Sequence, residues 1–179
     1  MEYETMNTEV FWLKLLKKYW INENIINHSI WVSKIAYELA IKINFKAGKN
    51  ILDTNKLKTA WLLHDIWKAR KWMHEFNSID ILKEEGLEEL SEIILHWFVY
   101  EHFKLKWINN IAYLPKTLEQ KTLCLADMYC DQNQKRVSID ERFDDILERY
   151  YYDENFLEVI RLAKPRMLKL EKEINNLIK

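Results

Sequence analysis

The chain has 179 residues, of which 49% are hydrophobic and 31% charged, and this composition is typical of one globular domain with a substantial core. Lys and Arg number 27 against 28 Asp and Glu, so the charge balance gives no argument for binding to nucleic acid or to an anionic membrane. Only two Gly and two Pro are present, which favours long helices joined by short connections.

The sequence shows no signal for secretion or membrane insertion. The first ten residues, MEYETMNTEV, are acidic and polar and lack the layout of a signal peptide. No apolar run approaches the roughly 18 to 20 residues that span a bilayer. Cys124 and Cys130 lie outside any CxxC pair, so we expect two reduced cysteines in a cytoplasmic protein.

Apolar residues at helical spacing predict three helices in the first part of the chain. Thr8 precedes a helix that runs to about Trp20, and a second helix is expected over about 22–44. Asp53 or Thr54 caps the third. One inward face is expected on the second helix, with Ile25, His28, Val32, Ile35 and Leu39. Another is expected on the third, with Leu57, Trp61, His64 and Lys68.

The rest of the chain is also predicted to be helical. Ser78 can cap a short helix that Gly86 ends, and residues 87–103 predict a longer helix that contains His96. The tail from Asp153 is helical, and Pro165 inside it predicts a kink or break. Two further helices lie between residue 103 and this tail, and each begins with a capping box: Thr117 with Gln120, and Ser138 with Glu141. No segment alternates with period two, so the predicted fold class is all-α.

Potential ligand side chains interrupt the most apolar parts of these helices. A lone histidine among aliphatic residues is more often a hydrogen-bonded core residue than a metal ligand. Several such positions on separate helices would each need a buried partner, and a shared metal would satisfy them together. Imidazole and carboxylate suit iron, manganese or zinc, whereas the lack of thiolate spacing argues against a structural zinc site. The positions within helices are His28, His64, Asp65, His96 and Asp127, and His74 follows in the connection after the third helix.

The order His, His-Asp, Asp on separate helices resembles the HD-domain superfamily of metal-dependent phosphohydrolases. The matching stretches are NHSIWVSKIAYELA, LLHDIWK and CLADMY. The resemblance implies an HD-type helical bundle in which His28, His64, Asp65 and Asp127 bind a divalent metal. HEFNSIDIL and IILH resemble the stretches with two extra histidines in members that hold two metals, and these correspond to His74 and His96.

The chain is expected to form a single HD domain over 1–179. The resemblance covers the metal-binding core at about 22–150, whereas the first helix and the C-terminal helical tail at about 153–179 gain nothing from it. The resemblance also implies two divalent ions as cofactors, iron, manganese or similar. Many family members have glycine at the positions of Trp67 and Ser78. Neither position is a ligand, but Trp67 can reshape or partly close the pocket, so this departure concerns the substrate more than the fold.

The expected function is hydrolysis of a small phosphorylated metabolite, a nucleotide or dinucleoside polyphosphate, by a metal-activated water. Asp65 is the candidate to bridge two metals or to orient the attacking water. Lys68 is placed to contact a phosphate oxygen, or is an ordinary surface lysine. Arg136 is a second candidate for the substrate phosphate, whereas Arg142 is expected to pair with nearby acidic residues.

Two other functions stay open at this stage. Some HD-fold proteins with the same ligand types are di-iron oxygenases, and iron dependence with oxygen consumption would identify one. A binding module with an idle metal site is the third reading, although such a protein would be expected to lack some ligands. The expected partner is a small phosphorylated molecule, with no nucleic acid and no membrane, and a homodimer stays open.

Overall fold

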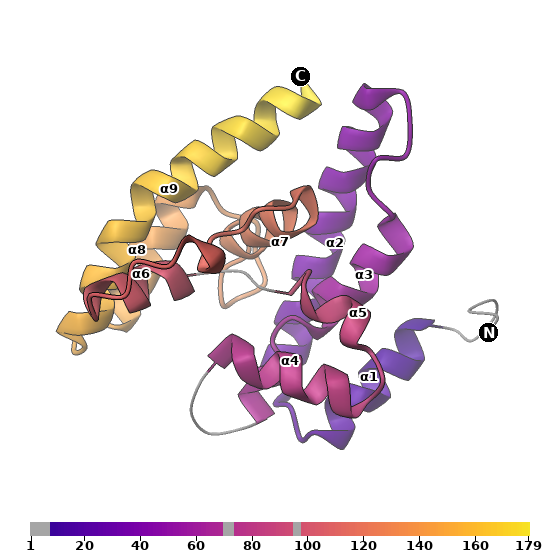
Figure 1. The fold of residues 1–179 in the computed structure, drawn as a ribbon, viewed down its shortest axis with the longest axis horizontal. Helices are drawn as coiled ribbons and strands as arrows, with labels where there is room; N and C mark the ends of the chain where they lie inside the picture. The colour runs from indigo at the N-terminus through magenta and orange to yellow at the C-terminus, as the bar shows by residue number, and fades with distance from the viewer. Residues whose placement is uncertain (1–7, 70–73, 95–97) are drawn as a thin grey trace.

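The computed structural model describes residues 8–69, 74–94 and 98–179, arranged as in Figure 1. These ranges contain no β-strand, which confirms the all-α prediction. The α-helices are α1 (Thr8–Lys18), α2 (Glu23–Ala47), α3 (Thr54–Leu63), α4 (His74–Glu84), α5 (Glu88–Ser91), α6 (Val99–Leu105), α7 (Leu118–Met128), α8 (Ile139–Arg149) and α9 (Glu154–Ile178). Two 3₁₀ helices, η1 (Ile66–Ala69) and η2 (Ile111–Tyr113), join them.

Helix α2 is the element against which α3, α7 and α9 pack. It begins where the Asn22 side chain accepts a backbone hydrogen bond of the first turn, and it ends before Gly48, whose φ of 65° suits glycine. The expected inward face is buried at Val32, Ile35 and Leu39. His28 continues this face one turn earlier, so its imidazole is directed toward α3 and α7.

Helix α3 ends earlier than predicted. We expected one helix to carry both His64 and Lys68, but the α-helix stops at Leu63 and a short turn leads into η1. In a continued α-helix the Trp67 N–H would donate to the Leu63 carbonyl. It donates instead to Ser78 Oγ at 3.1 Å, and that hydroxyl donates to the His64 carbonyl at 3.4 Å. A side chain of α4 therefore replaces the main-chain partner and ends the helix.

Ser78 is thus not the cap of the next helix. It lies in the second turn of α4, which begins at His74, so that prediction was wrong. Gly86 does end the helix as predicted, with a φ of 70°. The Leu87 N–H donates to the Leu82 carbonyl at 2.7 Å, which is the closing bond of a Schellman motif.

The single helix predicted for 87–103 is divided in the described part of the chain. Its N-terminal part forms only the one-turn helix α5, and α6 begins separately at Val99. The Glu92 carbonyl, just after α5, accepts a hydrogen bond from the Gln120 side chain at 2.6 Å. This bond ties the chain to α7 at the point where the predicted helix would have continued.

Both predicted capping boxes are present, at the starts of α7 and α8. Helix α9 continues through Pro165, so the predicted break does not occur. The next residue, Arg166, forms two hydrogen bonds with the buried carboxylate of Glu101, at 2.6 and 2.9 Å. This ion pair fixes α9 against α6 at the proline, where one main-chain hydrogen bond is missing.

Cys124 and Cys130 are both free and buried, as expected. Among the helices of the described ranges, none is long and apolar enough to cross a membrane.

Candidate metal centre

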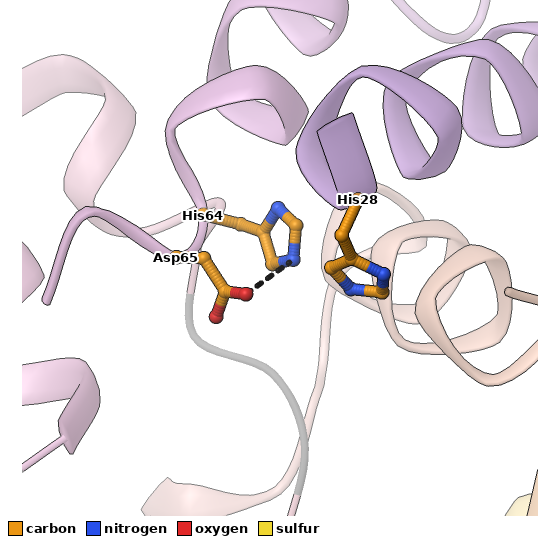
Figure 2. Close-up of side chains that lie close together, drawn as sticks. All are labelled: His28, His64 and Asp65. Atoms are coloured by element: carbon orange, nitrogen blue, oxygen red, sulfur yellow. Dashed lines mark ion pairs between the residues drawn. The ribbon is translucent and has the colours of Figure 1, made fainter. Parts of the chain in front are cut away.

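Three elements bring four of the predicted ligands together. His28 comes from α2, His64 and Asp65 come from the turn after α3, and Asp127 comes from the last turn of α7. Figure 2 shows the two imidazole rings and the Asp65 carboxylate directed toward one another. One ligand atom from each of His28, His64 and Asp65 lies within 4.8 Å of the others. This group can therefore bind a metal ion.

Asp127 joins this group through both histidines. His28 Nε2 lies 2.8 Å from Asp127 Oδ1, and His64 Nε2 lies 3.9 Å from the same oxygen. His64 Nε2 also lies 3.7 Å from Asp65 Oδ2. The side chains are 0% exposed for His64, 6% for Asp65, 7% for Asp127 and 12% for His28. Two carboxylates at this depth need a cation, because an isolated buried charge is costly.

The orientation of the His64 ring is set by α3 itself. Its Nδ1 lies 2.6 Å from the carbonyl of Trp61. A carbonyl only accepts, so Nδ1 carries the proton and donates it, and the unprotonated nitrogen of the neutral ring is Nε2. Histidines that bind metals usually donate their other N–H to a carbonyl or carboxylate in this way. In its neutral form the ring therefore has its lone pair on Nε2, the nitrogen that lies nearest the two aspartates and that can bind a metal.

Each oxygen of Asp65 has a polar partner from η1. Trp67 Nε1 donates to Oδ1 at 3.1 Å, and Lys68 Nζ forms an ion pair with Oδ2. The same ammonium lies over the Trp67 ring, 5.3 Å from its centroid. The Lys68 side chain is 30% exposed, so it lies between the buried group and solvent. A contact between Lys68 and a substrate phosphate stays a prediction.

The electrostatics of the group favour ionised carboxylates. Burial alone would raise the pKa of Asp65, but the charges of His64, Lys68 and His28 lower it well below its usual range. Burial opposes ionisation of Asp127 too, and the hydrogen bond from His28 outweighs it, so that pKa is also strongly lowered. Burial would lower the pKa of His28, but hydrogen bonds with Asp127 and Cys130 raise it to about 10. Without a metal, His28 is therefore the cation that neutralises Asp127.

The donor set fits a divalent ion. Two imidazoles and two carboxylates suit iron, manganese or zinc, and Nε2 of His64 is already oriented as a ligand nitrogen. His28, His64, Asp65 and Asp127 would hold the ion. The side chain of His74 and the whole of His96 lie outside the described residues, so a second ion stays a prediction.

The two arginines have different surroundings. Arg142 is buried and pairs with Asp145 at 2.7 Å, as expected. Arg136 is 48% exposed and pairs with Glu38 at 2.8 Å. Glu38 lies ten residues after His28 on α2, about 15 Å along the helix axis at 1.5 Å per residue. A contact between Arg136 and a substrate phosphate stays a prediction.

Sequence reasoning missed the two residues that contact the His64-Asp65 turn from outside the ligand set. From the sequence, both are departures from the glycine common in the family; Trp67 is expected to shape the pocket, and Ser78 is expected to cap a helix. In the structure, Trp67 binds the Asp65 carboxylate, and Ser78 binds backbone groups of both His64 and Trp67. The available signal for Ser78 was that it stands where many family members have glycine.

Comparison with known proteins agrees with this geometry. The HD domain family matches residues 25–130 of the chain. An uncharacterized protein of the archaeon Methanocaldococcus jannaschii is 31% identical over 165 residues, which cover 88% of this chain and 92% of the relative. No solved structure matches the chain. The family match covers more than half of the sequence and includes all four clustered side chains, so this chain belongs to the HD domain family.

Proposed function

We propose that this protein is a metal-dependent phosphohydrolase that acts on a small phosphorylated metabolite, with nucleotides and dinucleoside polyphosphates as the first substrates to test. HD domain proteins are generally metal-dependent phosphohydrolases. The observation that carries the proposal is the buried group of His28, His64, Asp65 and Asp127, drawn from three elements within the matched domain.

The side chains of this group have two roles, to bind the metal ion and to orient the attacking water. When bound, a divalent ion supplies Lewis acidity and a nucleophilic water near neutral pH. His64 would offer a neutral nitrogen, His28 would offer one after losing its proton, and Asp127 offers an ionised carboxylate. Asp65 is ionised by its surroundings, so it can accept a hydrogen bond from the attacking water and orient it.

Lys68 is suited to the substrate. Its ammonium lies next to the buried carboxylate and is still partly open to solvent. A phosphate that approaches from solvent therefore meets a cation before it meets the two aspartates, which would repel it. A charge-assisted contact of this kind both orients the phosphate and offsets charge on its oxygens.

A di-iron oxygenase is the second candidate, because the same imidazole and carboxylate donors suit iron. Measuring oxygen uptake beside phosphate release separates the two chemistries. A protein that binds metal but neither takes up oxygen nor releases phosphate would be a binding module.

The test begins with metal content, measured by plasma mass spectrometry on protein purified without chelator or histidine tag. Phosphate release is then assayed on nucleotides and dinucleoside polyphosphates, with and without chelator. We expect metal-dependent release by the wild-type protein and a loss of at least about 100-fold in Asp65→Asn. Asp144→Asn, at an exposed position of α8, is the matched control and should retain full activity. No metal in the wild-type protein, even after it is added back, would overturn the proposal.

A further inference from the structure

We propose that Trp67 and Ser78 are positioning residues that hold the Asp65 carboxylate in one orientation toward the metal. The inference deepens the proposed function and rests on its metal site. It concerns two side chains that are not themselves ligands and that contact the His64-Asp65 turn from η1 and α4.

Trp67 makes the two oxygens of Asp65 different. An indole N–H can only donate, and here it donates to Oδ1 at 3.1 Å. The other oxygen, Oδ2, is the one that lies 3.7 Å from His64 Nε2. A twist of the carboxylate plane about the Cβ–Cγ bond would break this hydrogen bond and the ion pair of Oδ2 with Lys68. Trp67 therefore helps to hold the plane in which one oxygen of Asp65 is directed at the ligand nitrogen of His64.

Ser78 fixes the backbone that carries this arrangement. Its side chain is fully buried, and its hydroxyl accepts from the Trp67 N–H and donates to the His64 carbonyl. These two bonds connect His64, just before Asp65, with Trp67, two residues after it, through one atom. Since the α-helix has already ended at Leu63, this hydroxyl provides the cross-link that the main chain no longer makes.

The two residues act in series. Ser78 sets the backbone position of Trp67, and Trp67 sets the Asp65 carboxylate. Loss of either should loosen the same ligand, so their effects on metal binding should be strongly non-additive. Groups that orient metal ligands typically change metal affinity by 10–100-fold when they are mutated. Burial alone would predict a different result, a loss of stability with unchanged metal coordination.

The experiment is a Co²⁺ titration of the metal-free full chain, followed by visible absorption. Trp67→Phe removes the N–H and keeps an aromatic ring beside Lys68, and Ser78→Ala removes the hydroxyl. Two buried side chains elsewhere provide matched controls. Trp12→Phe changes a buried tryptophan of α1, and Ser33→Ala removes a buried hydroxyl that donates to the Lys58 carbonyl.

We expect Kd for Co²⁺ to rise about tenfold in Trp67→Phe and in Ser78→Ala, with an altered ligand-field spectrum. The double variant should lose little more than either single one. Both controls should keep the wild-type Kd and spectrum, even where their melting temperature falls. Wild-type Kd and spectrum in folded Trp67→Phe and Ser78→Ala would overturn the inference. Metal binding by the wild-type chain without phosphate release would overturn the proposed function and leave this inference standing.

Discussion

Replacing Asp127 by asparagine tests whether its ion pair with His28 stabilises the metal-free protein. The two side chains lie 2.8 Å apart and are 7% and 12% exposed. Asparagine keeps the size of the side chain and can still accept a hydrogen bond. The change therefore removes the negative charge that the protonated imidazole faces and little else.

The pKa of His28 gives the magnitude and the sign. Folding raises it from 6.5 to about 10, and a difference of 10 − 6.5 at ~1.4 kcal/mol per unit is about 5 kcal/mol. Buried pairs that lose one partner typically lose a similar ~3–5 kcal/mol. Because the folded-state pKa is the higher one, this stabilisation is complete below pH 6.5 and is lost as the pH rises through 10. Asp127 stays ionised throughout that window.

We therefore expect Asp127→Asn to lower the free energy of unfolding by about 3–5 kcal/mol at pH 6 and by only about 1 kcal/mol at pH 9. Urea denaturation of the metal-free protein at the two pH values measures both losses. Asp144→Asn is again the control, with no large loss at either pH. An equal loss at pH 6 and pH 9 would refute the reasoning, because it would mean that the charge on His28 does not contribute.

Three further outcomes follow from the same geometry. Metal affinity should rise about tenfold per pH unit between pH 7 and 9, because binding must displace the proton of His28. Co²⁺ titrations at three pH values measure this rise, and an affinity that does not change with pH would contradict it. Lys68→Ala should raise KM for a phosphorylated substrate roughly tenfold, because a charge-assisted contact is lost. Steady-state kinetics measure KM, and a wild-type value in the variant would exclude the contact. Ser138→Ala should cost about 1 kcal/mol of stability through loss of the α8 cap, measured by urea denaturation, and an unchanged midpoint would contradict it.

The features that depended on local chemistry were predicted well from the sequence. The two capping boxes involve residues three apart, and each is present. The inward face of α2 follows from helical spacing, and His28 lies on it. One long-range feature was also expected, the convergence of His64 and Asp65 with Asp127, because buried polar groups on separate helices need shared partners.

The features that failed depended on partners far away in the sequence. Nothing near Glu92 shows that its carbonyl will bind Gln120, which lies 28 residues later. Pro165 alone predicts a kink or a break, and the break does not occur. The ion pair between Arg166 and Glu101 joins residues 65 apart and is not visible in a local window. In both cases a tertiary hydrogen bond decided where a helix ends or continues.

The end of α3 belongs to the same class and matters most for function. Apolar spacing up to Leu63 favours a helix that continues through Lys68, and in such a helix the Trp67 N–H would bind the main chain. A hydroxyl from α4 captures that N–H instead, and the indole of the same residue then reaches Asp65. The break in the helix is thus what lets Trp67 contact the carboxylate through its side chain while its backbone is held by Ser78. A substitution at Ser78 that restored the helix would therefore be expected to disturb metal binding without touching a ligand.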